Sequence, residues 1–259
     1  MDLTLGIARM PLWLSGFLFV VIPTLVFMCG PLVVRRFIPI DRIVVNNEVA
    51  GFKFATLGVI YAVLLGFAVI VVWERFAEAE GAVSREAGAL ASMYRLSGGL
   101  DPPTRAGLYD RLSEYAVSVI NEDWPAMSRA AQSSRTREVL TRTYDAVLSH
   151  TAESPREAAI VAELLNQLDH ITQERRVRID LASGIVPDLI WIVLLIGAIL
   201  TLGFTFFFGL ENLTAQTVMT GMLSLLIFSA LFVAMCIDHP FTGPVRVSPE
   251  AFTLVLEDF

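Results

Sequence analysis

The chain has 259 residues, of which 55% are hydrophobic, and its mean hydropathy is +0.63. This is more apolar than a soluble protein of that length requires, so the composition indicates an integral membrane protein. The formal net charge of −7 argues against a nucleic-acid partner, which would call for a basic face.

The first apolar run extends from about Leu12 to Val34 and has Pro23 near its middle. It is longer than the ~7–15 apolar residues of a secretion signal, and no small-residue cleavage site follows it, so we interpret it as the first membrane span. A proline inside a helix removes one hydrogen bond and bends the helix. We therefore expect a kink at Pro23, either a static one filled by neighbouring helices or a functional hinge.

The second apolar run, Asn46–Trp73, is the feature around which we expect the chain to be organised. It is uncharged from Phe54 to Trp73, long enough to cross the ~30 Å hydrocarbon core of a bilayer. One side carries small residues three or four positions apart: Gly51, Ala55, Gly58, Ala62 and Gly66. Small residues let another helix approach closely in lipid, so we predict that this run is the central packing helix.

Polar residues at the start of this run are candidates for the mouth of a pathway across the membrane. Asn47, Glu48 and Lys53 lie just before or within its first turns, and Lys53 is the only lysine in the chain. Ionisable residues at the edge of a span often mark the route of an ion or substrate. The alternative is structural, with Glu48 satisfying the helix dipole and pairing with Lys53 or Arg42.

Helical periodicity continues beyond Trp73. Phe76, Val83 and Leu90 recur every seven residues, which predicts a helix that leaves the membrane and packs along one apolar stripe. Gly98-Gly99 should end that helix.

Three further helices are predicted before the next span. Asp101-Pro102 should start the first, and Trp124-Pro125 should break it. The second extends from about Ser134 to His150, and the capping box Ser154-Pro155-Arg156-Glu157 begins the third. No stretch alternates with a period of two, so we predict an all-α soluble domain at residues 74–186.

A cluster of arginines closes this domain just before the third span: Arg175, Arg176 and Arg178. Two interpretations remain open for it. The side chains contact anionic lipid headgroups, or they pair with acids of their own domain.

The third and fourth spans are predicted at about Pro187–Phe208 and Ala215–Ile237. The fourth carries a polar stripe at helical spacing: Thr214, Thr217, Gly221 and Ser224. Such a stripe either packs and hydrogen-bonds against neighbouring helices or lines a pathway, for which Thr217 and Ser224 are the candidates. The proline-containing tail, 238–259, should be extended at first and then form a short helix capped by Ser248.

The predicted order is therefore two spans in residues 1–73 (about 12–34 and 54–73), the helical domain 74–186, two spans in 187–237 and the tail 238–259. With four spans, both termini and the domain share one side of the membrane. That side carries seven cations near the span ends and the other carries four. The seven are Arg9, Arg75, Arg85, Arg175, Arg176, Arg178 and Arg246; the four are Arg35, Arg36, Arg42 and Lys53. The excess predicts that the termini and the domain are cytoplasmic.

Short motifs of catalysis are missing from the sequence. It has no HExxH, CxxC, GxSxG, P-loop or dinucleotide-binding glycine pattern, and its three histidines are not spaced as metal ligands. We expect no enzymatic activity, no metal and no cofactor.

Three stretches resemble a bacterial family described as a bestrophin-like domain of unknown function: NNEVAGFKFATLGVIYAVLLGF, RRVRIDLASGIVPDLIW and DHPFTGPVRVSPEAF. The resemblance implies a bestrophin-like architecture of four spans and a large cytosolic helical domain. It further implies a pentamer whose second span lines a pore, as in true bestrophins. True bestrophins are anion channels, so the resemblance also implies anion conduction. Two departures argue against calcium gating: glycine and alanine replace the bulky apolar neck of the second span, and no acidic cluster resembles the calcium clasp.

These observations lead to two hypotheses. The first is a homo-oligomeric, multi-pass ion channel of the bacterial inner membrane, whose partners are lipids and an inorganic ion and whose second span lines or flanks the pathway. The alternative is a non-conducting membrane scaffold or sensor whose helical domain recruits a cytosolic partner.

Overall fold

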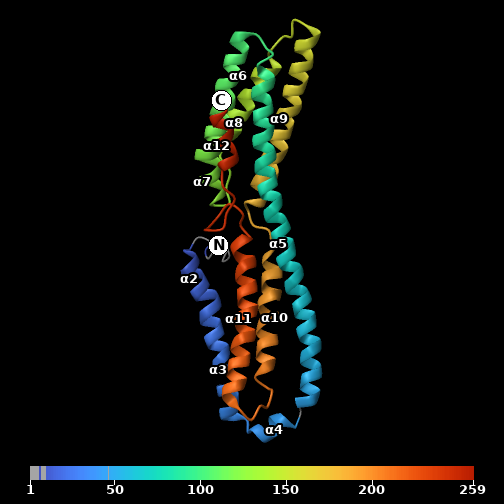
Figure 1. Ribbon diagram of the computed structural model, residues 1–259, viewed down its shortest axis with the longest axis vertical. Helices are drawn as coiled ribbons and strands as arrows, with labels where there is room; N and C mark the ends of the chain where they lie inside the picture. Colours follow the sequence, from blue (N-terminus) through green and yellow to red (C-terminus); the bar gives the residue numbers. More distant parts are fainter. Residues whose placement is uncertain (1–5, 7–9, 46) are drawn as a thin grey trace. The chain divides into compact units, whose positions relative to one another are not determined.

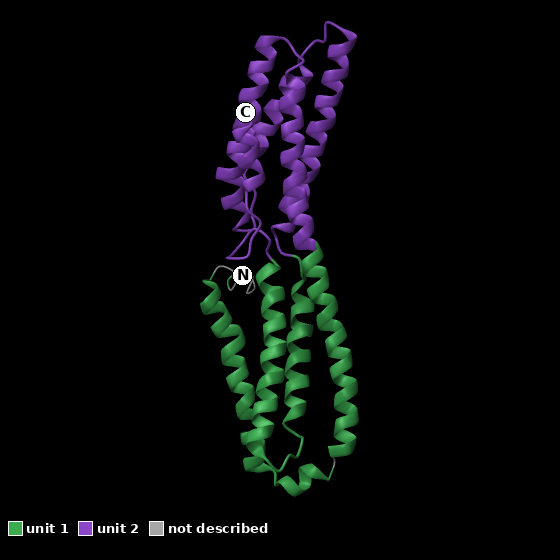
Figure 2. Ribbon diagram, viewed as in Figure 1, with its two compact units in different colours: residues 1–74, 185–238 green, residues 75–184, 239–259 purple. Residues whose placement is uncertain are grey.

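The computed structural model describes residue 6, residues 10–45 and residues 47–259, and within these ranges it contains helices and no strand (Figure 1). Arg9, counted above for orientation, and Asn46, the first residue of the second run, lie outside the described residues. The chain divides into two compact units (Figure 2). Unit 1 comprises residues 1–74 and 185–238, and unit 2 comprises residues 75–184 and 239–259.

Unit 1 contains the helices that the sequence predicted to span a membrane. In chain order they are α2 (Leu12–Gly16), the π-helical turn η1 (Phe17–Val21), α3 (Ile22–Phe37), α4 (Ile40–Val44), the first part of α5 (Asn47–Ser97), α10 (Asp188–Thr205) and α11 (Leu213–Ile237). Four continuous helical segments among the described residues are long and apolar enough to cross a bilayer, and the most apolar stretch of each exposes much of its surface. The structure therefore contains four candidate spans, in the order that the sequence predicted.

The irregularity in the first span lies just upstream of Pro23. The helix is π-helical over Phe17–Val21, and Pro23, which has no N–H to donate, is the second residue of α3 directly after that turn. Helical structure continues through the proline as far as Phe37. The irregularity expected at Pro23 is thus present as a π-helical turn directly before the proline.

The central packing helix of unit 1 is α11, not α5. Half of the most apolar stretch of α11 is buried (50%), against 11% for α5. The prediction for α5 was wrong because small residues show that a close approach is possible but not which partner makes it. In this chain α11 contacts α3, η1 and α10.

Unit 2 is a helical bundle. It contains the remainder of α5 from Arg75, α6 (Pro102–Ser118), the π-helical turn η2 (Val119–Asp123), α7 (Trp124–Met127), α8 (Ser134–Leu148), α9 (Pro155–Leu181) and α12 (Glu250–Glu257). The start signals act as predicted. The Asp101 carboxylate accepts the N–H of Thr104 (3.2 Å), and the Ser154 hydroxyl accepts that of Glu157 (3.1 Å).

The predicted apolar faces meet in one core in unit 2. Val83, Leu90, Leu112, Leu164 and Leu168 are each at most 2% exposed. One boundary prediction was wrong, because Trp124-Pro125 does not break the helix. The turn η2 leads directly into α7, and Pro125 is the second residue of α7, directly after the π-helical turn.

The segment after the fourth span is part of unit 2 rather than a separate tail. Phe241 and Phe252 are buried in its core, and both pack edge-on against the Trp124 ring. The Trp124 indole N–H donates to the carbonyl of Val247 (3.2 Å). Pro249, rather than Ser248, directly precedes α12, although the Ser248 hydroxyl accepts the N–H of Glu250 at 3.5 Å.

Phe252→Ala tests whether this segment holds unit 2 together. Phe252 is 0% exposed, so its loss should destabilise the domain by about 3–5 kcal/mol, the usual cost of removing a buried phenylalanine ring. Leu254→Ala is the matched control, because Leu254 lies on the same helix and is 56% exposed. Thermal unfolding of the detergent-purified protein should separate the two variants, and equal melting temperatures would contradict the assignment.

Candidate functional site

The start of α5 is fixed to the loop between α10 and α11. The Asn47 side-chain amide donates to the carbonyl of Gly209 (2.8 Å), and its oxygen accepts the Gly209 N–H (2.9 Å). Only glycine fits at position 209, since a Cβ there would lie 2.8 Å from the backbone nitrogen of Val44. Asn47, predicted as a pathway residue, therefore has its polar atoms engaged in positioning α5.

Glu48 and Lys53 differ from Asn47 in being free of such contacts. Both are exposed, and among the ion pairs of the described residues neither of them takes part. Glu48 lies in the first turn of α5, where a negative charge suits the helix dipole. The expected pairing with Lys53 or Arg42 is not formed, so both charges remain available at the end of the span.

The small-residue face of α5 has no partner among the residues that the structure describes. A Cβ placed on Gly51, Gly58 or Gly66 would meet no atom within 4 Å, and Ala55 and Ala62 are exposed. The contacts that α5 makes with other helices of unit 1 use large aromatic rings instead. Tyr61 is 4% exposed and fills the space beside Gly197, while Phe54 stacks on Phe204 with ring centroids 6.0 Å apart. The chain thus packs α5 through its aromatic side and leaves the small side uncovered.

Gly221 and Ser224 of the α11 polar stripe face the interior of unit 1, whereas Thr214 is exposed. Ser224 is 0% exposed, and Gly221 lies against Met28, whose sulfur would be 2.8 Å from a Cβ. Thr217 is half-buried. For Ser224 and Gly221 this placement favours the packing interpretation over the lining of a pathway.

Unit 1 also contains a buried polar contact near the end of α3. The Arg35 guanidinium donates to the side-chain oxygen of Gln216 (2.9 Å), and the Gln216 amide donates to the carbonyl of Phe208 (2.7 Å). A cavity of about 360 Å³ adjoins it. Its lining is mostly apolar: Phe54, Thr205, Phe208, Leu210, Gln216, Met219, Thr220 and Leu223.

The strongest electrostatic feature of the chain lies in unit 2, where four charged side chains are buried together. Arg178, 0% exposed, donates to both carboxylate oxygens of Glu86 (2.8 and 3.0 Å) and to Asp123 (3.1 Å). Arg175 holds Asp123 with two further bonds (3.0 and 3.1 Å), and the Tyr115 hydroxyl donates to Glu86 (2.7 Å). Each carboxylate oxygen has a donor, as buried charges require.

Burial and neighbouring charges set the protonation states in this cluster. Burial lowers the pKa of Arg178, but the negative charge and hydrogen bonds of Glu86, together with Asp123, outweigh it and raise the pKa. Burial, followed by the Glu86 charge, raises the pKa of Tyr115 well above its usual value. Arg178 therefore stays charged and Tyr115 stays neutral at every physiological pH.

The arginine cluster thus divides. Arg175 and Arg178 pair with acids of their own domain, so lipid headgroup contact does not fit these two, whereas Arg176 is exposed. Glu86 and Asp123 were not among the residues that the sequence patterns singled out. A signal for Glu86 was present, since it lies three residues after Val83 and four before Leu90, on the apolar face of the helix.

Comparison with known proteins supports the fold. The family model described as Bestrophin-like domain matches residues 19–252. Two solved variants of a bacterial bestrophin homologue from Klebsiella pneumoniae are similar. One has a TM-score of 0.70, 16% identity and coverage of 92% of this chain and 96% of that chain. The other has a TM-score of 0.69 and 17% identity, and the match covers 92% of this chain and 97% of that chain. None of the curated protein sequences matches this chain.

Removing one partner of the buried cluster should unfold unit 2. In Arg178→Met, Glu86 and Asp123 lose donors while remaining buried, which typically costs about 3–5 kcal/mol. Arg176→Met is the control, because it removes a neighbouring exposed arginine and should change stability by less than about 0.5 kcal/mol. Chemical denaturation of both variants tests this, and a stable Arg178→Met protein would show that the cluster does not hold the bundle.

Proposed function

Because the chain belongs to the bestrophin-like family, we propose that it is a homo-oligomeric membrane ion channel in which α5 lines or flanks the pathway. The single observation that carries the proposal is the uncovered face of α5. Unit 1 contains four long apolar helical segments, yet a Cβ on Gly51, Gly58 or Gly66 of α5 would meet no atom within 4 Å in the described part of the chain. Lipid gives such a face no packing advantage, whereas another copy of the chain does.

The finer features of the proposal follow from the resemblance. A pentamer with α5 around the axis would place the exposed charges Glu48 and Lys53 near one mouth of the pathway. Anions are the proposed permeant species, because true bestrophins conduct them. We place the chain in the bacterial inner membrane, with both termini and the domain 74–186 in the cytoplasm, in accordance with the excess of arginine on that side.

A second candidate function is a non-conducting scaffold or sensor, and one observation favours it. Unit 2 has a groove of about 400 Å³ between α8 and α9, with Arg137 and Arg176 exposed at its edge. An acidic segment of a cytosolic partner would suit such an edge. Flux measurements separate this function from the first, since a scaffold conducts nothing.

Oligomerisation through α5 is tested by Gly58→Leu. A Cβ at position 58 has open space around it within the described residues, so the protomer should fold normally while the contact between copies is blocked. Gly203→Leu is the control, because position 203 lies in another span and is equally open within the chain. Native mass spectrometry should show smaller assemblies for Gly58→Leu alone. The same oligomer for both variants would remove the small-residue face from the interface.

Conduction is tested in liposome flux assays and planar-bilayer recordings of the purified protein. A unit charge about 10 Å from an ion in water changes its energy by about 0.4 kcal/mol, which is about a twofold change in local ion concentration per charge. Lys53→Ala should therefore lower the anion-to-cation permeability ratio about twofold or more, and Glu48→Ala should raise it. Unchanged ratios in both variants would take these residues out of the pathway, and the absence of any flux would favour the scaffold.

A further inference from the structure

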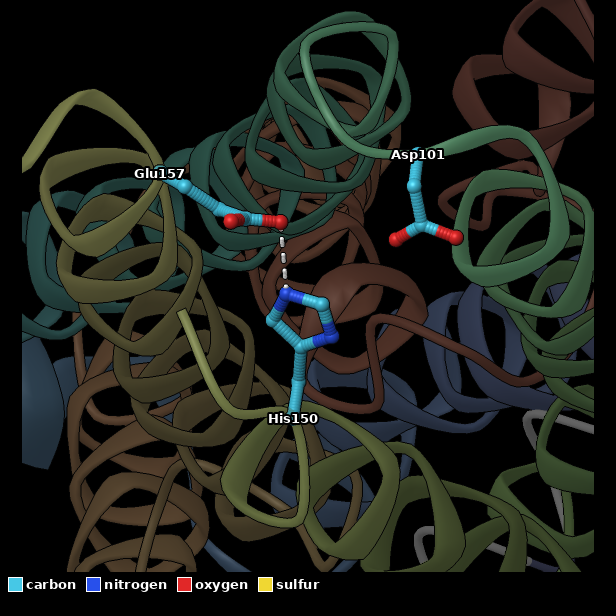
Figure 3. Close-up of side chains that lie close together, drawn as sticks. All are labelled: Asp101, His150 and Glu157. Atoms are coloured by element: carbon cyan, nitrogen blue, oxygen red, sulfur yellow. Dashed lines mark hydrogen bonds and ion pairs between the residues drawn. The ribbon is translucent and has the colours of Figure 1, made fainter. Parts of the chain in front are cut away.

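Three potential metal ligands from separate parts of the sequence meet in unit 2, where two helix connections come together (Figure 3). Asp101 directly precedes α6, His150 follows α8 and Glu157 lies in the first turn of α9. One ligand atom from each lies within 4.8 Å of the other two. His150 Nε2 is 2.9 Å from a carboxylate oxygen of Glu157, and Figure 3 shows the imidazole ring between the two carboxylates.

Helix capping holds the two carboxylates in place. Oδ2 of Asp101 accepts the N–H of Thr104 (3.2 Å), and Oε2 of Glu157 accepts the N–H of Glu153 (2.7 Å). The other oxygen of Glu157 is the one that meets His150. The His150 and Glu157 side chains are each only 15% exposed. The ligand positions are therefore set by the backbone, as a preformed site requires.

The charge of this group is not balanced by the protein. Within the part of the chain that the structure describes, neither carboxylate forms an ion pair with an arginine or lysine. Two anionic carboxylates with an imidazole between them attract a cation.

We propose that Asp101, His150 and Glu157 bind a divalent transition metal, and that Zn²⁺ fits them best. One imidazole nitrogen and two carboxylate oxygens supply three ligands, and water would complete the tetrahedral set that Zn²⁺ prefers. Ca²⁺ is disfavoured, because it takes six to eight oxygen ligands and avoids imidazole. A bound ion would tie the start of α6, the end of α8 and the start of α9 to one another. This proposal does not depend on conduction.

The experiment is a titration of Zn²⁺ into the full chain, purified with an affinity tag that contains no histidine and stripped with a chelator. Isothermal titration calorimetry should show one Zn²⁺ bound per chain. Loss of an outer-shell contact typically weakens metal binding about 10–100-fold. His150→Gln removes a direct ligand, so it should weaken Zn²⁺ binding by more than this. Asp101→Asn and Glu157→Gln should each weaken it as well, while both retain a side-chain oxygen that can cap the helix.

His170→Gln is the matched control, because it removes an exposed histidine from the same bundle and should bind Zn²⁺ as the unmodified chain does. Co²⁺ gives a second measurement: the d–d bands of a nitrogen- and oxygen-ligated site should appear without the sulfur charge-transfer band that Cys29 or Cys236 would produce. Melting temperatures in chelator show whether a variant has folded. No Zn²⁺ binding by the unmodified chain, or equal affinity in His150→Gln, would overturn the proposal.

Discussion

The buried contact of Arg178 with Glu86 and Asp123 is the interaction on which unit 2 depends. It joins α5, η2 and α9, and the same guanidinium lies 5.1 Å from the centre of the Trp124 ring and 5.9 Å from that of Phe252. A charge in an apolar core costs several kcal/mol unless a partner matches it, so each of these helices can pack only in the register that brings its charge to the others. The contact therefore specifies the arrangement of the bundle as well as contributing to its stability.

The helices of unit 1 are held together differently, because helices in lipid gain no hydrophobic free energy from burying apolar surface against one another. Close packing has to select the neighbours, and in this chain it selects α11 as the centre. Met28 lies against Gly221 of that helix, and elsewhere in the unit Tyr61 lies against Gly197. In these contacts large side chains pack against glycines of α10 and α11. No comparable side chain packs against Gly51, Gly58 or Gly66 of α5 in the described part of the chain. The least covered span of the protomer is thus also the one best suited to approach another helix closely.

Much of this fold could be predicted from the sequence, since hydropathy, seven-residue spacing and capping residues act locally. They gave the four spans, the end of α5 at Ser97 and the start of α9 after Ser154. Pairing between distant elements could not be predicted in the same way. Nothing local shows that Asp123 would accept Arg175, or that Phe252 would fill the core of a domain whose other helices precede it by some seventy residues or more.

The two polar clusters of unit 2 differ in charge balance, and therefore in whether a bound ion would neutralise any charge. Around Arg178, two guanidinium groups face two carboxylates, every carboxylate oxygen has a donor, and no charge is left for a ligand to neutralise. Around His150, two carboxylates face one imidazole that carries at most a single charge, and their remaining hydrogen bonds come from neutral groups of Thr104 and Glu153. Histidine spacing along the sequence could not reveal this difference, because Asp101 and Glu157 reach His150 through two separate connections. The excess of negative charge, rather than the ligand types alone, is the reason that we propose a cation site at the second cluster.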